Sequence, residues 1–335
     1  MNKAPEIVVH STDAGQRLDR WFKRKFPMLT HGHLEKLLRT GQVRVDGSRA
    51  RSGRRLVTGE SIRVPPAVLA QEDLSRRKSN VFVSEQDKVA LRQTVIYQDD
   101  DLLAINKPAG LAVQGGSKIT RHLDGMLDAL RFDSQERPKL VHRLDKDTSG
   151  VLLLARNAKA AALWTQMFRR RQVRKLYWAI VVGRPSLDVG EVTVPLAKVS
   201  GCRGEKVIAN VREGKHALTR YRVIASLDNT AAWLALEPQT GRTHQLRVHC
   251  GLLGTPILGD GKYGGKKAFL PSLTHTNKVH LHGRALNIAI PEKKPISIVA
   301  PLPPHISDTI RFFGFEEGAA AAAHVLTSKT HTISG

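Results

Sequence analysis

The residues best suited to chemistry lie in one polar stretch, residues 141–150, which runs directly into the apolar segment 151–155. The stretch holds two carboxylates, Asp145 and Asp147, close behind His142. A carboxylate on a loop beside a rigid strand can act as a nucleophile or a general base. The alternative is an Asx-turn, in which either aspartate caps backbone amides before the strand. Residues i and i+2 of an extended chain point the same way, so spacing alone does not choose between the two aspartates.

Two further segments place polar side chains beside predicted strands. Tyr177 lies in the predicted strand 175–182, where alternation puts it on one face with Ala179 and Val181. Taken alone, it would be a core aromatic. Arg242 comes just before a predicted helix that Thr243 would cap, so its guanidinium can point into a cleft. On charge alone, Arg242 would be one more phosphate contact.

Several classes of protein are excluded by what the sequence lacks. It contains no phosphate-binding Gly-Lys-Ser/Thr loop, no dinucleotide fingerprint and no cluster with metal-ligand spacing, so we expect no cofactor and no metal. No apolar run approaches the length of a membrane span, so no membrane partner is expected. The first fifteen residues do not resemble a signal peptide, and two cysteines cannot form a disulfide framework. A reduced, cytoplasmic location fits best.

The charge indicates the partner. The 335 residues include 53 Lys+Arg against 30 Asp+Glu, a formal net charge of +23. Residues 17–63 alone hold thirteen basic and four acidic side chains. A charge of this size favours a polyanion, and an anionic membrane surface is less suitable because no long basic amphipathic helix is present. Nucleic acid is therefore the expected partner.

The order of predicted elements suggests a small basic domain followed by a large one. Helices are expected around residues 18–26 and 31–40, and a strand at 43–45 turns through Asp46-Gly47 towards a partner strand at 61–64. Many strands with few helices follow, which favours an α+β fold with a mixed, largely antiparallel sheet. The expected division is a domain at 15–64, a linker at 65–93, a catalytic domain at 94–315 and a disordered tail at 316–335.

The small domain resembles the alpha-L RNA-binding domain of a primary binding protein of the small ribosomal subunit. The resemblance rests on the pattern Arg-Leu-Asp, Leu-Leu-x-x-Gly-x-Val-x-Val-x-Gly and Gly-Glu-x-Ile between residues 15 and 64. The alternative is a solvated basic face on a structural module. If the resemblance holds, eight cations neutralise phosphates and supply affinity without sequence choice. They are Arg17, Arg20, Arg24, Lys36, Arg39, Arg44, Arg51 and Arg55.

Four ordered motifs resemble those of the RluA family of pseudouridine synthases. They are residues 106–110 (Asn-Lys-Pro-Ala-Gly), 142–150 (His-Arg-Leu-Asp-Lys-Asp-Thr-Ser-Gly), 175–179 (Lys-x-Tyr-x-Ala) and 240–249 (Thr-Gly-Arg-Thr-His-Gln-Leu-Arg-Val-His). With the N-terminal domain, the resemblance is to the RluC type, which acts on large-subunit ribosomal RNA. It implies that uridine is isomerised without a cofactor: the bond from ribose to uracil N1 breaks, the base turns, and it rejoins through C5.

The resemblance also implies roles for individual residues. Asp145 matches the catalytic aspartate, which would attack the anomeric carbon or draw a ribose proton. Arg242 matches its ion-pair partner, which would keep a desolvated carboxylate charged. Tyr177 matches the active-site tyrosine, whose hydroxyl is a candidate for taking the C5 proton. Four residues are expected to contact the substrate. Leu246 would pack against the target base, and Arg143 would fill the space that the base leaves in the RNA stack. His142 would face the RNA, and Lys107 would contact a phosphate.

Alternatives from the same and other classes remain open at this point. The first alternative is that the substrate is transfer RNA instead of large-subunit ribosomal RNA, since phosphate contacts carry no sequence information. A catalytically silent RNA-binding factor for ribosome assembly is a second alternative, although intact Asp145, Tyr177 and Arg242 argue against it. An N-glycosidase would release free uracil, whereas a synthase releases none. We expect the protein to act as a monomer.

Overall fold

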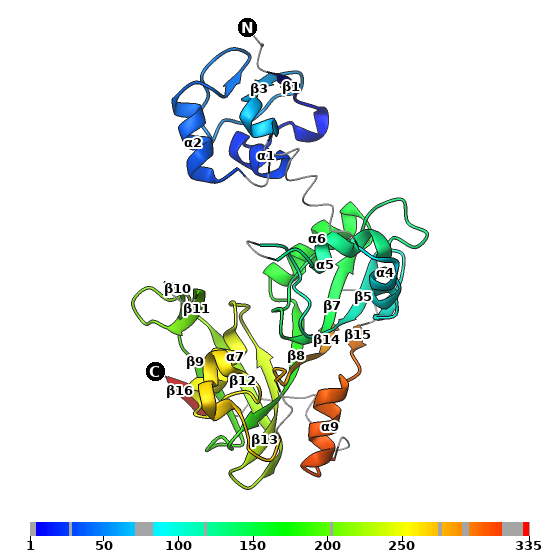
Figure 1. Cartoon of the computed structure of the whole chain (residues 1–335), viewed down its shortest axis with the longest axis vertical. Helices are drawn as coiled ribbons and strands as arrows, with labels where there is room; N and C mark the ends of the chain where they lie inside the picture. Colours follow the sequence, from blue (N-terminus) through cyan, green and yellow to red (C-terminus); the bar gives the residue numbers. More distant parts are fainter. Residues whose placement is uncertain are drawn as a thin grey trace. The chain divides into compact units, whose positions relative to one another are not determined.

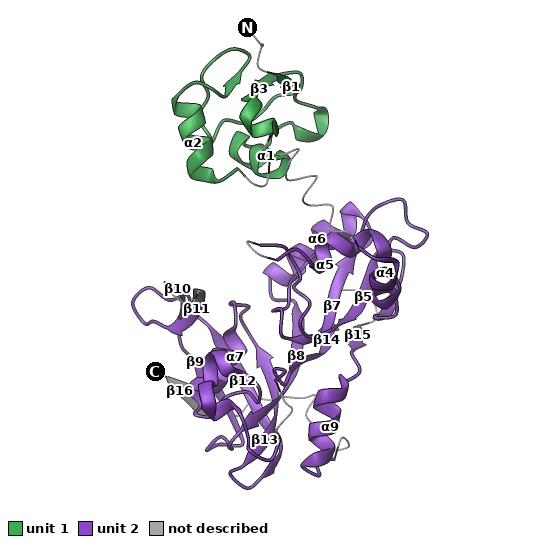
Figure 2. Cartoon of the chain, in the orientation of Figure 1, with its two compact units in different colours: residues 1–82 green, residues 83–335 purple. Residues whose placement is uncertain are grey.

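The computed structural model describes residues 5–26, 29–70, 83–116, 119–201, 204–273, 277–289, 295–316 and 331–334. The chain divides into two compact units, residues 1–82 and 83–335 (Figure 2). Each unit has its own hydrophobic core. No helix among the described residues is long and apolar enough to cross a membrane.

The first unit packs helices against a small antiparallel sheet of order β1-β3-β2 (Figure 1). The predicted helices form because Leu18, Trp21 and Phe22 share one buried face, and because the Thr30 hydroxyl accepts a hydrogen bond from the His33 amide at 3.3 Å. The elements are β1 (Glu6–Val8), the 3-10 helix η1 (Ser11–Asp13), α1 (Leu18–Lys25), α2 (His31–Arg39), β2 (Arg44–Val45) and β3 (Ser61–Arg63).

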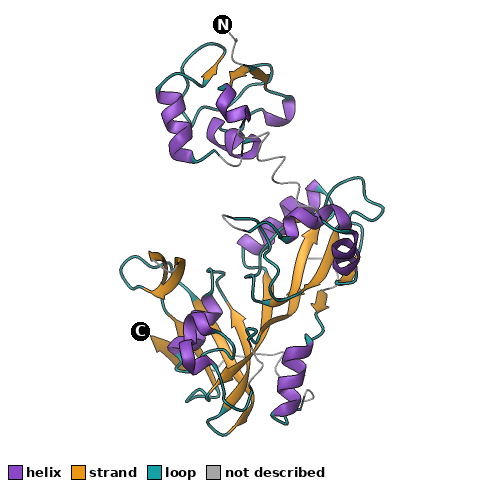
Figure 3. Ribbon diagram, viewed as in Figure 1, coloured by secondary structure: helices purple, strands orange, loops and turns teal. Residues whose placement is uncertain are grey.

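The second unit is built on a long mixed sheet (Figure 3). Within the described residues its order is β16-β9-β12-β13-β8-β14-β7-β5-β4, with β15 added to β14 and β6 to β7. Neighbours are antiparallel except for two parallel pairs, β14 with β7 and β16 with β9. The predicted α+β fold with a largely antiparallel sheet is confirmed. The strands are β4 (Val95–Gln98), β5 (Leu102–Lys107), β6 (Lys139–Leu140), β7 (Ser149–Ala155), β8 (Val173–Val182), β9 (Val189–Thr193), β12 (Leu218–Leu227), β13 (Ala231–Pro238), β14 (Leu281–Ile288), β15 (Ile296–Val299) and β16 (His331–Ser334).

Both faces of this sheet are covered, which explains the apolar run that follows the polar motif. Every residue of β7 is buried. Leu153 lies in the core beneath α6, whereas its neighbour Leu152 lies in the core formed by α5 and η2 on the other face. The remaining elements are the hairpin β10 (Leu196–Gly201) and β11 (Gly204–Ala209), α4 (Glu85–Arg92), α5 (Leu123–Met126), η2 (Leu127–Leu130), α6 (Ala158–Arg169), α7 (Gln245–Leu252), α8 (Gly261–Gly264), η3 (Gly265–Ala268) and α9 (Pro304–Phe312).

The boundaries expected from the sequence need three corrections. The first unit begins before residue 15, because β1 pairs with β3 and completes the small sheet. The expected linker 65–93 is wrong at both ends: residues 66–70 are helical, and α4 is capped by Ser84 and buries Leu91 in the core of the second unit. In the expected disordered tail, residues 331–334 form β16, while residues 317–330 lie outside the described residues.

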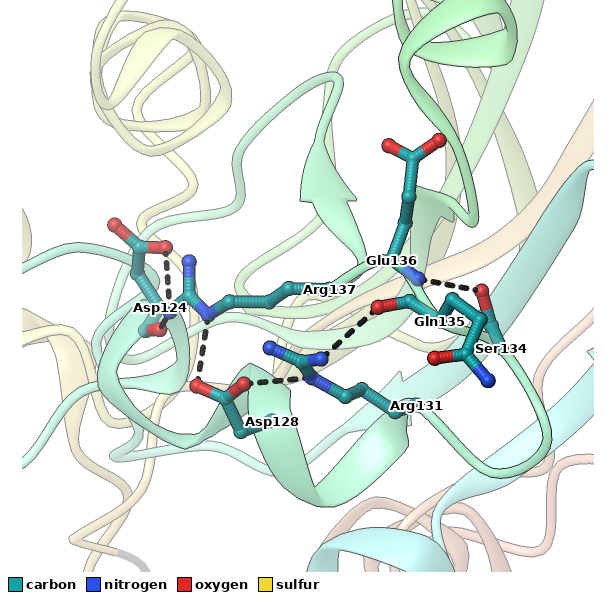
Figure 4. Close-up of polar contacts among 7 residues, drawn as sticks. All are labelled: Asp124, Asp128, Arg131, Ser134, Gln135, Glu136 and Arg137. Atoms are coloured by element: carbon teal, nitrogen blue, oxygen red, sulfur yellow. Dashed lines mark hydrogen bonds and ion pairs between the residues drawn. The ribbon is translucent and has the colours of Figure 1, made fainter.

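A group of charged side chains holds the segment that leads into the motif (Figure 4). Asp128 accepts hydrogen bonds from Arg131 at 2.8 Å and from Arg137 at 3.0 Å, and Arg131 also donates to the Gln135 carbonyl at 3.0 Å. The exposed ion pairs contribute little stability one by one, but together they fold the loop back on η2. The chain then enters β6, which pairs with β7 and turns directly into the motif.

Candidate active site

The motif loop is fixed to the sheet at its carboxyl end by two glycines. Gly150 has a φ of +117° and faces Gly283 across the parallel pair of β7 and β14. A Cβ added at Gly150 would lie 2.2 Å from the Gly283 carbonyl oxygen, so no other residue fits there without moving the strands. This close approach brings the end of the loop next to β8, because β14 also pairs with β8.

The structure separates the two aspartates that spacing could not. Asp147 faces Arg247 at 3.5 Å, and the buried Arg247 guanidinium makes two 2.7 Å hydrogen bonds to the carboxylate of Asp260. Asp145 instead lines a pocket of about 510 Å³, whose lining does not include Asp147. The Asp147 carboxylate therefore faces the buried Arg247, whereas the Asp145 carboxylate is at the wall of the pocket.

This pocket gathers most of the residues that the motifs singled out. A volume of this size is within the range of small-ligand sites. Its wall is formed by the motif loop, the end of α6, the start of β8 and the β13–α7 connection. From these segments come Val141, His142, Arg143, Leu144, Asp145, Thr148, Thr165, Phe168, Arg169, Arg171, Lys175, Tyr177, Pro238, Gln239, Thr240, Gly241, Arg242, Thr243, Gln245 and Leu246, with Leu281 from β14.

Tyr177 lies within the electrostatic reach of Asp145. Burial raises the pKa of the Tyr177 phenol well above its ordinary value, and the negative charge of Asp145 raises it further. The phenol is therefore neutral at pH 7. The ring lies against the glycine pair, since a Cβ added at Gly283 would be 3.5 Å from its Cε1 atom.

The expected ion pair between Asp145 and Arg242 is absent from the described contacts. Arg242 is exposed, and its Nε donates to the His216 carbonyl at 3.1 Å. The Arg242 backbone is held more firmly, because its amide donates to Gln245 Oε1 at 3.0 Å. Both Asp145 and Arg242 nonetheless line the same pocket.

The side-chain cap that the sequence predicted for Thr243 at the start of α7 is not formed. The residue before α7 is His244, in a left-handed conformation and without a side-chain cap. Gln245 accepts from Thr240 Oγ1 at 2.7 Å and donates to the Leu218 carbonyl at 2.9 Å, so its amide ties the β13–α7 connection to β12. Gln245 and Arg247 lie inside the 240–249 motif and are positioning residues, but nothing in the sequence pattern distinguishes them from their neighbours.

His142 forms part of the pocket wall. Its Nε2 accepts a hydrogen bond from the Leu153 amide at 2.8 Å, and its ring stacks on Phe168 with centroids 4.2 Å apart. Burial lowers the pKa of His142 to about 3, and the charge of Lys175 contributes in the same direction. The imidazole is therefore neutral. Next to it, Arg143 is exposed, and on the α7 side Leu246 is buried and lines the pocket.

Lys107 does not make the phosphate contact that was expected. Its side chain is fully buried, and its ammonium donates to the carbonyls of Pro108 at 2.8 Å, Leu111 at 2.9 Å and Lys146 at 3.2 Å. Burial lowers the pKa of Lys107 to about 8, while the charges of Asp147 and Asp145 act to raise it. With its three donors used, Lys107 is a cation beneath the motif loop and has none left for RNA.

The eight cations expected to contact RNA from the first unit fall into different environments. Arg17 pairs with Asp19 at 2.7 Å, and Arg24 pairs with Asp13. Arg44 and Arg55 are hydrogen-bonded to backbone carbonyls. Lys36, Arg39 and Arg51 are exposed, and no described contact engages their charged groups; Arg20 is also exposed. Exposed pairs such as Arg17–Asp19 are weak enough to exchange for phosphate.

Comparison with known proteins identifies the family. A family model described as RNA pseudouridylate synthase matches residues 101–251, which include the motif loop, Tyr177 and Arg242. Ribosomal large subunit pseudouridine synthase C of Rickettsia felis is 39% identical over 308 residues, covering 90% of this chain and 98% of that protein. The protein of that name from Escherichia coli K12 is 34% identical over 288 residues, covering 85% of this chain and 88% of that protein.

Structural comparison agrees. The solved structure of human RNA pseudouridylate synthase domain containing 4 is 30% identical with a TM-score of 0.58, and the match covers 72% of this chain and 98% of that one. The chain belongs to the RNA pseudouridylate synthase family. It is therefore an RNA pseudouridine synthase, and the RluA-type enzyme that the four motifs predicted is confirmed.

Proposed function

We propose that this enzyme converts specific uridines of large-subunit ribosomal RNA to pseudouridine, with Asp145 as its nucleophile. The observation that carries the proposal is the pocket in which Asp145, Tyr177, Arg242 and Leu246 meet from segments far apart in the sequence. The names of the relatives from Rickettsia felis and Escherichia coli support the choice of RNA, and so does the net charge of +23. We also propose that the enzyme acts as a monomer, and its RNA substrate supports action in the cytoplasm.

The target uridine must leave its stack before Asp145 can reach it, at a cost of a few kcal/mol that is lowest in loops and bulges. The Asp145 carboxylate then bonds to C1′ while the bond from C1′ to uracil N1 breaks, and the electron pair leaves with the base. An alternative start is removal of a ribose proton by the same carboxylate. After the base turns, C5 bonds to C1′ and the carboxylate is released, as in a retaining glycosidase.

The remaining step removes the proton from C5. Tyr177 is neutral, so it can take this proton only while passing its own to another base. The released carboxylate of Asp145, whose charge reaches the phenol, is that base. A proton then passes from the Asp145 carboxyl through solvent to N1, which completes the isomer and restores the carboxylate. Leu246 packs against the base, and Arg143 fills the space that the base vacated. The His142 ring completes the wall beside Arg143.

Arg242 is proposed to turn from the His216 carbonyl to the Asp145 carboxylate when substrate closes the pocket. Catalytic contacts of this kind often tighten only in the complex. An arginine near a desolvated carboxylate lowers its pKa by roughly 1–3 units, which keeps the nucleophile ionised beneath the base. We therefore expect Arg242→Met to lose most activity and to retain RNA binding. Binding that falls in parallel with activity would exclude this role.

The test of the nucleophile compares Asp145→Asn with Asp147→Asn on a transcript of large-subunit ribosomal RNA. Pseudouridines are mapped by reverse-transcription stops after carbodiimide treatment. Asp145→Asn should form none, and Asp147→Asn should retain activity because its carboxylate faces Arg247. Pseudouridine formed by Asp145→Asn would refute the proposal. Transfer RNA in a parallel reaction tests the alternative substrate, and free uracil in either reaction would indicate an N-glycosidase.

A further inference from the structure

One wall of the pocket carries a group of cations to which the reaction gives no role. The helix α6 ends at Arg169, and β8 begins at Val173. Arg169, Arg171 and Lys175 from this junction line the pocket, whereas Arg170, between the two arginines, does not. Adjacent positions of the same helix terminus thus differ in whether their side chains reach the site.

The backbone at Arg171 is unusual for an arginine. Its φ is +60°, a left-handed conformation that glycine adopts readily and side chains with a Cβ adopt under strain. The Arg171 amide donates to the Phe168 carbonyl at 3.2 Å, and the Gln172 amide to the Met167 carbonyl at 3.0 Å, which is how a helix commonly ends at a glycine. An arginine here costs stability that glycine would not. Strained residues of this kind concentrate at functional sites.

The electrostatics of this wall suit an anion. Burial lowers the pKa of the Lys175 ammonium, and the positive charge of Arg171 lowers it further. No described carboxylate pairs with either side chain. Among the described residues that line the pocket, Asp145 is the single carboxylate facing five Arg and Lys side chains. Uracil and ribose are uncharged, so the part of the substrate that these cations can neutralise is the phosphodiester backbone.

We propose that Arg171 and Lys175 form a phosphate subsite that binds a phosphodiester next to the everted uridine and holds its ribose over Asp145. The inference rests on the proposed function and adds a second RNA contact region, inside the catalytic unit. Arg171 lies exposed with a planar fork that matches a phosphate, and Lys175 lies deeper as a point charge. Because both act on the backbone, they position the nucleotide without reading the base.

The test uses Arg171→Gln with Arg170→Gln as the matched control, since each removes one charge from the same helix end. Binding is measured in the Asp145→Asn protein, so that turnover does not intervene, with a stem-loop that contains the target uridine. Arg171→Gln should raise the Kd roughly 3–10-fold and reduce the slope of log K against log salt by about 0.7–0.9, the value for one lost phosphate contact. Arg170→Gln should change the slope by much less. In the active enzyme, Arg171→Gln should raise KM and, because the ribose is held less firmly over Asp145, also lower kcat.

Two further measurements separate a phosphate contact from a structural effect. A methylphosphonate replaces the phosphodiester 5′ or 3′ to the target uridine, one at a time, and at one of the two positions Arg171→Gln should cause no further loss of affinity. Arg171→Gly should show the same binding defect while unfolding at the same or a higher urea concentration, because glycine relieves the left-handed backbone.

The phosphate subsite would be overturned if Arg170→Gln and Arg171→Gln changed the Kd and the salt slope equally. It would also be overturned if Arg171→Gln still weakened binding to each of the two methylphosphonate RNAs. A failure of the proposed function would look different, because Asp145→Asn would then still form pseudouridine.

Discussion

Replacing Gly150 with alanine should separate the two strands that bring the motif loop to Tyr177. A Cβ at this position meets the Gly283 backbone oxygen at 2.2 Å, and a φ of +117° is strained for any residue with a side chain. The backbone strain costs about 1–3 kcal/mol. Forcing a methyl group between packed strands costs about 1–3 kcal/mol more. We therefore expect Gly150→Ala to lower the free energy of unfolding by about 4 kcal/mol. This is a large part of the typical free energy of unfolding of a protein, about 5–15 kcal/mol.

The control is Gly283→Ala on the facing strand. A Cβ there would meet its neighbours at 3.5 Å or more, which is ordinary contact, so we expect little loss of stability. The assay is urea unfolding followed by tryptophan fluorescence, together with pseudouridine formation at a temperature where each variant is folded. Gly150→Ala should also lower kcat, because a displacement of about 1 Å at a catalytic group can cost about 100-fold. If Gly150→Ala were as stable as Gly283→Ala, the explanation of the glycine pair would be wrong.

Two other perturbations follow from buried charges. Arg247→Met should destabilise the protein by about 3–5 kcal/mol, since it leaves the buried Asp260 carboxylate unpaired, and the double variant with Asp260→Leu should recover most of that loss in urea unfolding; an equal loss in both variants would contradict this. Burial lowers the pKa of His249, His280 and His282 to about 4 from 6.5, so the neutral forms contribute stability that is complete above pH 6.5 and is lost as the pH falls towards 4. At pH 5, each of these three histidines should lower the free energy of unfolding by about 2 kcal/mol. A free energy of unfolding that does not change between pH 7 and pH 5 would contradict this prediction.

Much of the local structure was predictable because it depends on neighbours in the chain. Thr30 and Asn157 belong to the residue types that cap helices, and their side chains accept hydrogen bonds from the amides of His33 at 3.3 Å and Ala160 at 2.8 Å. The alternation predicted for β8 is confirmed: Tyr177 packs with Ala179 in the core on one face of the strand, whereas Trp178 lies in the core on the other face. Element boundaries were less reliable. The sequence predicts a linker where α4 forms, because its one buried leucine gives a weak apolar pattern and because its packing against η2 within the second unit is a long-range contact.

The sequence by itself determined the family, the small basic unit and the largely antiparallel fold, because motif order, charge and hydrophobic alternation can all be read along the chain. Tertiary structure decided which aspartate faces the pocket, since Arg247 lies a hundred residues from Asp147 and only folding brings them together. It also placed Lys107 beneath the loop and turned Arg242 towards a backbone carbonyl. A side chain's partner depends on distances through space, and these are fixed when distant strands pack.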